Sequence, residues 1–113
     1  VDVSSVAVVD DAPTGIALIT VSRDGENTIV VAAGANGRVN AHEVEAGIRA
    51  VGGAGTVLLA QLEIPLAAVR TGAETIAELG GRTVLNLSPG RAVPDALLAL
   101  CDPLVVNESE AHD

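Results

Sequence analysis

An uninterrupted apolar run, Val57-Leu58-Leu59-Ala60, constrains the fold more than any other stretch of this chain. Apolar residues without polar alternation predict a β-strand covered on both faces, as in parallel sheets flanked by helices. Gln61 and Glu63 follow the run, and Pro65 then stands where a helix is expected to begin. Because ligands of open α/β sheets bind outside the carboxyl ends of the strands, Glu63 is a candidate ligand-binding group. The alternative is a solvated acid that faces the positive end of the helix dipole.

The second half of the chain alternates between strand and helix patterns. A helix is predicted over residues 41–51, where Asn40 and Glu43 have the spacing of a capping box. After the strand at residues 57–60, the pattern predicts a helix from Pro65 to Leu79, a strand at 83–85, a short helix from Pro94 to Leu100 and a strand at 104–106. Strands that alternate with helices predict a parallel sheet with right-handed crossovers.

The first half of the chain predicts an antiparallel hairpin. Two β-rich runs, at residues 16–21 and 28–33, flank an Asp24-Gly25 turn signal. A further short β-type run covers residues 6–9. A two-stranded hairpin is marginally stable alone and needs a partner surface. The predicted fold is therefore α/β, a partial doubly wound (Rossmann-like) parallel sheet with an appended hairpin, divided into residues 1–36 and 37–113.

Composition narrows the possible functions. The 113 residues carry a net charge of −9 and include no Lys, which argues against a nucleic-acid phosphate backbone as partner and excludes a Walker A motif. No apolar segment approaches the length of a membrane span, so we expect a cytoplasmic protein that binds no membrane. The single cysteine, Cys101, follows an apolar run and is expected to be a buried structural thiol. The missing initiator Met suggests an internal piece of a longer protein.

Polar side chains follow each of the three predicted parallel strands. Gln61 and Glu63 follow the first, Asn86 the second, and Asn107 and Glu110 the third. Such strand ends are expected to face one crevice. Asn107 and Glu110 could place an amide near phosphate oxygens and a carboxylate near a hydrated Mg²⁺. Their alternative role is a helix start, with Asn107 as N-cap and Glu110 three residues on.

Six short motifs follow one another along essentially the whole chain: Thr14-Gly15-x-Ala17-x-Ile19-x-Val21, Gly25-Glu26-Asn27, Gly34-Ala35-Asn36, Gln61-Leu62-Glu63-x-Pro65, Asn86-x-x-Pro89 and Asn107-x-x-Glu110. Each motif is weak alone, but together their order and spacing resemble those of the ribokinase-like (PfkB) carbohydrate kinases. The loop Asn86-Leu87-Ser88-Pro89 departs from the family's frequent Asn-Pro-Ala-Pro, which affects loop stiffness more than chemistry.

The resemblance implies roles for individual residues. The 1–36 unit would contain the β-lid, a hairpin that closes over the sugar, with Ile19 and Val31 as apolar sugar contacts. Glu63 would hydrogen-bond sugar hydroxyls. Asn107 would bind near the nucleotide phosphates, and Glu110 would organise the Mg²⁺ shell indirectly, through water.

The resemblance also implies cofactors and partners. ATP and Mg²⁺ would be required, with a monovalent cation such as K⁺ as a further candidate. The substrate would be a small sugar that is phosphorylated, D-ribose to ribose 5-phosphate being favoured over fructose or adenosine. Two lids would pack together in a homodimer, which would give the hairpin its partner surface.

The family's catalytic motif is absent from these 113 residues. Gly-Ala-Gly-Asp, which supplies the base Asp and an anion hole of backbone N–H groups, does not occur in the sequence. The chain therefore resembles only the middle third of such a kinase, and alone it is expected to be inactive, because positioning and charge stabilisation supply most of the catalysis of phosphoryl transfer. The alternative is a non-catalytic, lid-bearing module that self-associates.

Overall fold

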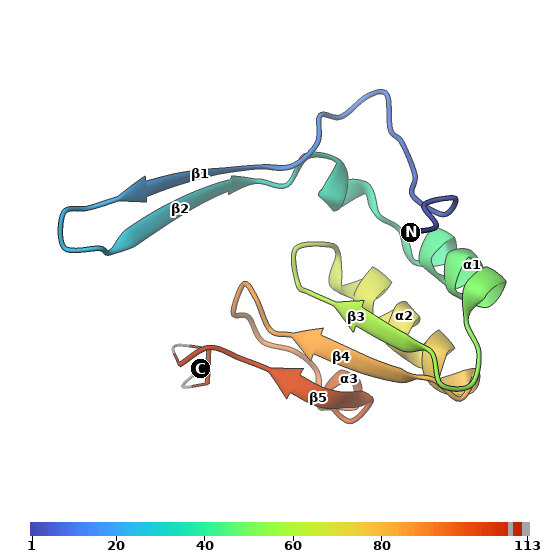
Figure 1. Ribbon diagram of the computed structural model, residues 1–113. Coiled ribbons are helices and arrows are strands. Elements are labelled where there is room, and N and C mark those ends of the chain that lie inside the picture. The colour runs from blue at the N-terminus through green and yellow to red at the C-terminus, as the bar shows by residue number, and fades with distance from the viewer. Residues whose placement is uncertain (109, 112–113) are drawn as a thin grey trace.

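The computed structural model describes residues 1–108, 110 and 111 and contains two separate sheets. Strands β1 (Ile16–Val21) and β2 (Asn27–Ala32) form the hairpin, while β3 (Val57–Ala60), β4 (Arg82–Asn86) and β5 (Cys101–Val105) form a parallel sheet in the order β3-β4-β5 (Figure 1). The helices are the 3-10 helix η1 (Gly34–Arg38), α1 (Ala41–Val51), α2 (Leu66–Glu78) and α3 (Asp95–Leu98). The predicted α/β fold with an appended hairpin is confirmed.

Local capping signals set the ends of the two longer helices. The Asn40 side chain accepts the Glu43 N–H at 3.0 Å, which makes the predicted N-cap of α1. Pro65 is the N-cap of α2, so the helix begins at Leu66, one residue later than predicted. At the other end of α2, Gly80 has a φ of 77°, and Gly81 N–H donates to Ile76 O at 2.9 Å. This Schellman motif explains why the helix ends at the predicted glycine pair.

The core lies on one face of the parallel sheet. Val69 and Ala73 of α2 and Leu97 of α3 pack with Leu62 and Leu85 in one buried cluster. Helix α1 joins this layer where Gly72 of α2 leaves room for its neighbours, since a Cβ there would lie within 3.2–3.4 Å of Leu58, Val44 and Ile48 side chains. The buried hydrophobic side chains are all aliphatic, as a sequence without Phe, Tyr, Trp or Met requires, and the hydroxyl side chains of Thr75 and Thr83 are buried with them.

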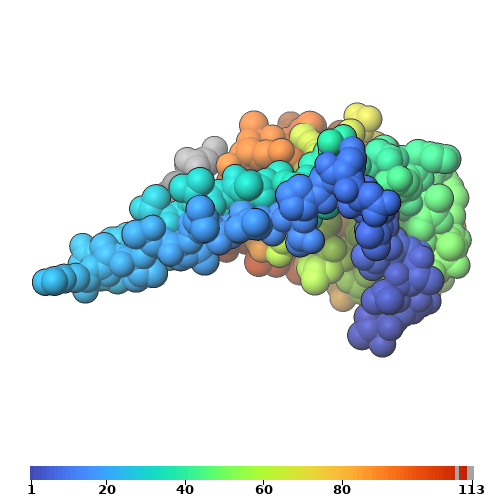
Figure 2. Space-filling view, turned by 90° about the horizontal axis from the view of Figure 1, so that it is seen from above, coloured from blue at the N-terminus to red at the C-terminus, as the bar shows by residue number. Residues whose placement is uncertain are grey.

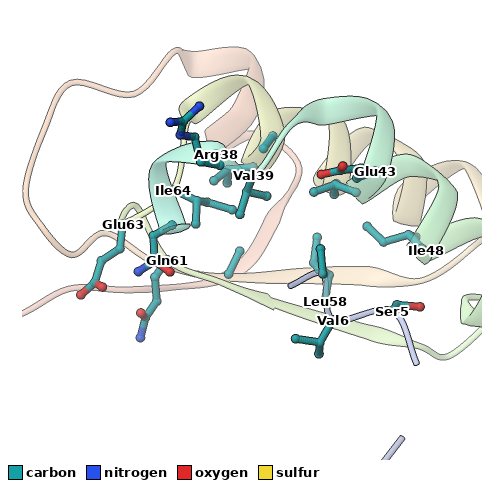
Figure 3. Close-up of a pocket in the computed structure, with 18 of the residues that line it drawn as sticks. Ser5, Val6, Arg38, Val39, Glu43, Ile48, Leu58, Gln61, Glu63 and Ile64 are labelled. Carbon is teal, nitrogen blue, oxygen red and sulfur yellow. The ribbon is translucent and has the colours of Figure 1, made fainter. Parts of the chain in front are cut away.

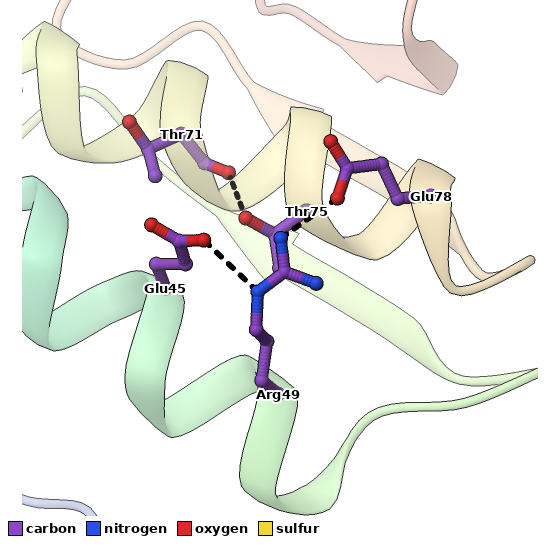
Figure 4. Close-up of polar contacts among 5 residues, drawn as sticks. All are labelled: Glu45, Arg49, Thr71, Thr75 and Glu78. Atoms are coloured by element: carbon purple, nitrogen blue, oxygen red, sulfur yellow. Dashed lines mark hydrogen bonds and ion pairs between the residues drawn. The ribbon is translucent and has the colours of Figure 1, made fainter.

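An ion-pair network bridges α1 and α2 on the outer side of this layer. Arg49 donates to Glu45 Oε1 at 2.9 Å within α1 and to Glu78 Oε2 at 2.8 Å on α2 (Figure 4). These hydrogen bonds, that to Glu78 first, raise the pKa of Arg49. All three side chains are largely exposed, so the network adds a modest stabilising contact between the two helices.

The opposite face of the parallel sheet is open, which differs from the expectation for β3. Leu58 is half-buried beneath the helices, but Val57 and Leu59 are 45% and 73% exposed. Successive side chains of a strand point to opposite faces, and within the described residues no helix covers the Val57 and Leu59 side. The apolar run therefore has one covered face and one bare face.

The hairpin is exposed on both faces. Ile19 pairs with Ile29 and Leu18 with Val30, so each face of the ribbon carries branched aliphatic side chains. The turn at residues 22–26 closes with the Ser22 N–H donating to Glu26 O at 2.9 Å. The predicted strand at residues 6–9 is wrong, because among the described residues no strand lies beside them to form a hydrogen-bond ladder.

The last strand also begins earlier than predicted. Cys101 opens β5 instead of following a helix, and β5 carries one extra residue opposite β4 between Cys101 and Leu104, where Pro103 sits. A bulge tolerates proline because it already breaks the hydrogen-bond ladder. Cys101 is only partly buried; its Sγ donates to Leu97 O at 3.2 Å, and burial raises the pKa of the thiol.

No helix among the described residues has the length and apolar character needed to cross a membrane.

Candidate functional site

The carboxyl ends of the three parallel strands lie side by side. Strand β3 pairs with β4 up to Ala60 and Leu85, so Gln61 and Asn86 are the next residues after this last pair. Backbone bonds continue beyond the strands: Leu62 N–H donates to Ser88 O, and Leu87 N–H to Val105 O, both at 2.9 Å. The polar residues predicted to share this edge are therefore held on adjacent segments.

A groove of about 780 Å³ opens beside the end of β3. Its long wall is apolar and is formed by α1, α2 and β3, with Ile48 and Leu58 pointing into it (Figure 3). Gln61 and Glu63 lie at one end of the groove, and both side chains are exposed. Leu62 between them is 2% exposed and belongs to the core, so the chain after β3 is held by Leu62 with an exposed polar residue on either side of it. The structure thus places Glu63 at the rim of a cavity beyond a strand end.

Further polar residues border the same groove, among them Ser5, Asn36, Arg38 and Glu43, and none of them follows a strand of the parallel sheet. Asn36 and Arg38 lie on η1, between the hairpin and α1. Arg38 Nη2 lies 3.4 Å from Asp11 Oδ2 in an exposed ion pair. Asn36 and Arg38 line the same groove as Gln61 and Glu63, but they lie on a turn between elements and not at the end of a strand. The available signal was the polar pair itself within a short glycine-rich turn.

Asn107 and Glu110 bond to each other after β5. The Asn107 side chain accepts the Glu110 N–H at 2.8 Å, and Glu110 Oε2 accepts the Asn107 N–H at 2.9 Å. These two bonds are those of a capping box, so the structural role considered from the sequence is present. Glu110 Oε1 and Asn107 Nδ2 take no part in these two hydrogen bonds. One carboxylate oxygen and one amide donor are therefore not engaged in the capping box, and among the described residues no group of three or more potential metal ligands comes together.

Glu110 borders a different cavity from Glu63. This second cavity is smaller, about 530 Å³, and it is also lined by Leu87 and Arg91. Arg91 Nη2 donates to Ile64 O at 3.3 Å, which ties the loop after β4 to the turn before α2. The strand ends thus share one edge of the sheet, but their carboxylates border two cavities.

Ile19 and Val31 lie on the same face of the hairpin. Ile19 is opposite Ile29 and Val31 is opposite Ala17, which makes Ile19 and Val31 diagonal neighbours on that face. The hairpin projects from the body on the side to which the carboxyl ends of β3, β4 and β5 point (Figure 1), and it forms a narrow arm in the view from above (Figure 2). Neither Ile19 nor Val31 lines the groove beside Glu63 or the cavity beside Glu110.

Comparison with known proteins agrees with this arrangement of an α/β sheet, polar strand ends and a projecting hairpin. Residues 1–113 match the profile of the pfkB family carbohydrate kinases. A ribokinase of Staphylococcus aureus (strain COL) is 40% identical over 112 residues, which cover 99% of this chain and 36% of that protein. A ribokinase of Haemophilus influenzae (strain ATCC 51907) is 34% identical over 99% of this chain and 36% of its own length. The chain belongs to the pfkB family of carbohydrate kinases.

Solved structures show the same fold. The crystal structure of Sa239 matches 99% of this chain and 37% of its own, with a TM-score of 0.86 and 39% identity. The structure of Arabidopsis thaliana ribokinase complexed with ribose and ATP matches 88% of this chain and 32% of its own, with a TM-score of 0.67 and 28% identity. The chain therefore spans about a third of the length of the relatives it matches.

Proposed function

We propose that this chain is the lid-bearing part of an ATP-dependent kinase that phosphorylates D-ribose to ribose 5-phosphate. The observation that carries the proposal is Glu63, an exposed carboxylate beyond the end of β3, at the rim of a groove on the side toward which the hairpin projects. Relatives named ribokinase support the sugar, and one of them was solved with ribose and ATP. Fructose and adenosine are the alternative substrates to test.

The reaction assigns separate tasks to this chain and to the rest of the kinase. The γ-phosphorus of ATP forms a bond to the 5-oxygen of ribose as its bond to the β,γ-bridging oxygen breaks, and ADP leaves. The hydroxyl proton passes to a base that this sequence does not contain, so the isolated chain is expected to be inactive. Here Glu63 accepts hydrogen bonds from sugar hydroxyls, while Ile19 and Val31 cover the sugar and exclude water.

The residues after β5 face the nucleotide side in this proposal. Asn107 would donate its amide toward a phosphate oxygen, and Glu110 would hold Mg²⁺ through water, with the capping bonds fixing both side chains. Mg²⁺ keeps several waters in such sites and neutralises charge on the phosphates when bound. A monovalent cation such as K⁺ and a cytoplasmic location belong to the same proposal.

Replacing Glu63 with Gln tests the sugar site. In the full-length kinase, Glu63→Gln should raise the KM for ribose about 10- to 100-fold, because hydrogen bonds to a charged group contribute about 1.5–3 kcal/mol. The KM for ATP should stay unchanged. Glu74→Gln, at an exposed position of α2, is the matched control. Unchanged ribose affinity in Glu63→Gln would rule out Glu63 as a sugar-binding group. If the full-length kinase prefers fructose or adenosine, that compound and not ribose is its substrate.

A second candidate function is suggested by the bare faces of the hairpin. Leu18 and Ile19 are on opposite faces and are 66% and 60% exposed, so one face remains for a partner when the other covers sugar. A homodimer in which two lids pack together would cover it, whether or not the chain belongs to an active enzyme. Sedimentation equilibrium tests this: Leu18→Thr should weaken a dimer that the wild-type protein forms, whereas a wild-type monomer would refute the lid-mediated dimer.

A further inference from the structure

The root of the hairpin is a close crossing of two backbone segments. Residues 13–15 enter β1, and residues 32–36 leave β2, where Ala35 N–H donates to Pro13 O at 2.8 Å. A Cβ on Gly15 would lie 2.8 Å from Ala33 O and 3.2 Å from Asn36 Nδ2. A Cβ on Gly34 would overlap Pro13 O and lie 3.0 Å from Gly15 N. A side chain on either glycine would therefore come too close to the other backbone segment.

Other glycines nearby do not share this environment. Gly25, at the tip of the hairpin, has a φ of 91°, but nothing lies within 4 Å of the position where its Cβ would be. Gly37, on η1, would place a Cβ 3.7 Å from Ala33 Cβ, an ordinary contact. Gly34 combines a positive φ of 54° with the overlap, and Gly15 has the close contacts without a positive φ. Close contact between the two backbone segments therefore distinguishes Gly15 and Gly34 from the other glycines, whereas a positive φ alone does not.

We propose that Gly15 and Gly34 are positioning residues that set the angle at which the hairpin lies over the strand ends. This inference rests on the proposed role of the hairpin as a sugar lid. The strands of the hairpin have six residues each, so the ribbon is about 20 Å long, and a rotation of about 10° at its root would move its tip by about 3 Å. Ile19 and Val31 would move with it. Displacements of about 1 Å at a reacting centre already reduce rates strongly.

Distance measurement between lid and body tests the angle without reference to activity. Spin labels at Arg23→Cys, near the hairpin tip, and Glu74→Cys, on α2, would be placed in the full-length protein with Cys101→Ser and any other cysteines replaced. Gly15→Ala and Gly34→Ala should shift or broaden the distance distribution, while Gly37→Ala, which would meet only an ordinary contact, should leave it as in the wild type. Identical distributions in all three variants would overturn the proposal.

Kinetics of the full-length kinase provide the second readout. Gly15→Ala and Gly34→Ala should raise the KM for ribose at least about tenfold while the KM for ATP stays unchanged. Gly34→Asn should behave like Gly34→Ala, because Asn tolerates a positive φ but still carries a Cβ. An equal rise in Gly25→Ala would assign the effect to backbone strain and refute the crossing. Loss of the folded body in both root variants, seen by circular dichroism, would refute it too.

The two arms separate this inference from the function on which it rests. A wild-type protein that phosphorylates no sugar would refute the proposed kinase activity, and the spin-label distances would still decide whether the crossing sets the angle of the hairpin. Active variants with shifted distances but an unchanged KM for ribose would show that the lid angle does not position sugar contacts, which would overturn the inference while leaving the kinase activity intact.

Discussion

The Ser22 hydroxyl donates to the Asp24 carboxylate inside the hairpin turn. This hydrogen bond, followed by the backbone N–H groups of Asp24 and Glu26, lowers the pKa of Asp24 below its ordinary value of 3.8. The ionised carboxylate therefore stabilises the turn fully above the unfolded-state pKa, and the contribution is lost as the pH falls through the lower folded-state pKa. The turn is thus expected to loosen only in acid.

Removing the hydroxyl tests this assignment. Ser22→Ala should raise the pKa of Asp24 toward its ordinary value, as measured by an NMR titration of the side-chain carboxyl carbon. Asp2 is an internal control, because hydrogen bonds from Ser4 lower its pKa independently and should not change in the variant. An unaltered titration of Asp24 in Ser22→Ala would mean that backbone donors alone hold the carboxylate.

Glu110 has two roles: it accepts a capping hydrogen bond from the Asn107 N–H, and it is proposed to hold Mg²⁺ through water. One substitution should remove the second role and keep the first. In Glu110→Gln the amide oxygen can still accept the Asn107 N–H, but the negative charge is lost. The Mg²⁺ concentration for half-maximal kinase rate should therefore rise about tenfold, as for other groups that act on a metal indirectly, without a loss of stability. Glu108→Gln, exposed on the same turn, is the control. An identical Mg²⁺ titration for both variants would contradict the role of Glu110.

At the scale of elements, the end of α2 depends on a single left-handed glycine. Gly80→Ala would force a φ of 77° on a residue with a Cβ and should lower the free energy of unfolding by about 1 kcal/mol. The contacts that the described residues offer the new Cβ are Ala54 atoms at 3.7 Å, an ordinary distance, so backbone strain and not a clash is responsible. Gly53→Ala, where nothing lies within 4 Å, should be nearly neutral. Equal denaturant midpoints would show that the Schellman motif contributes nothing.

Local signals account for most elements that were predicted correctly. Asn40 caps α1, Gly80 ends α2 and Gly25 occupies the hairpin turn, and each acts on residues within a few positions along the chain. The failures involve partners that are distant in sequence. Residues 6–9 have β-type composition but no strand beside them, and β5 could begin at Cys101 because pairing with β4 and a bulge accommodated Pro103.

The same distinction applies to the candidate site. Parallel alternation predicted that the polar strand ends share one edge of the sheet, and the backbone bonds from Leu62 and Leu87 hold them there. It could not predict that Glu63 and Glu110 border different cavities, because loop paths such as that of Arg91 separate them. The glycine crossing at the root of the hairpin was equally invisible, since Gly15 and Gly34 lie far apart in sequence and meet only in the fold.

At the scale of the whole molecule, the chain has one finished layer and several bare apolar surfaces. Helices cover one face of the parallel sheet, while Val57 and Leu59 on the other face and Leu104 and Val105 on β5 are 41–73% exposed. Patches of this kind in α/β folds are normally covered by further helices. Relatives about three times as long contain the additional chain that could cover them.

The cost of truncating Leu59 should therefore depend on which protein carries it. In a kinase of the relatives' length, Leu59→Ala should lower the free energy of unfolding by about 2–5 kcal/mol, because the side chain would be buried there. In the 113-residue chain alone, where Leu59 is 73% exposed, the same change should cost less than about 0.5 kcal/mol. Leu85→Ala is the matched control, since Leu85 is 0% exposed and should be costly in both. Urea denaturation of the four variants measures these differences, and an equally small cost for Leu59→Ala in both proteins would show that this face of the sheet stays open to solvent in the longer kinase.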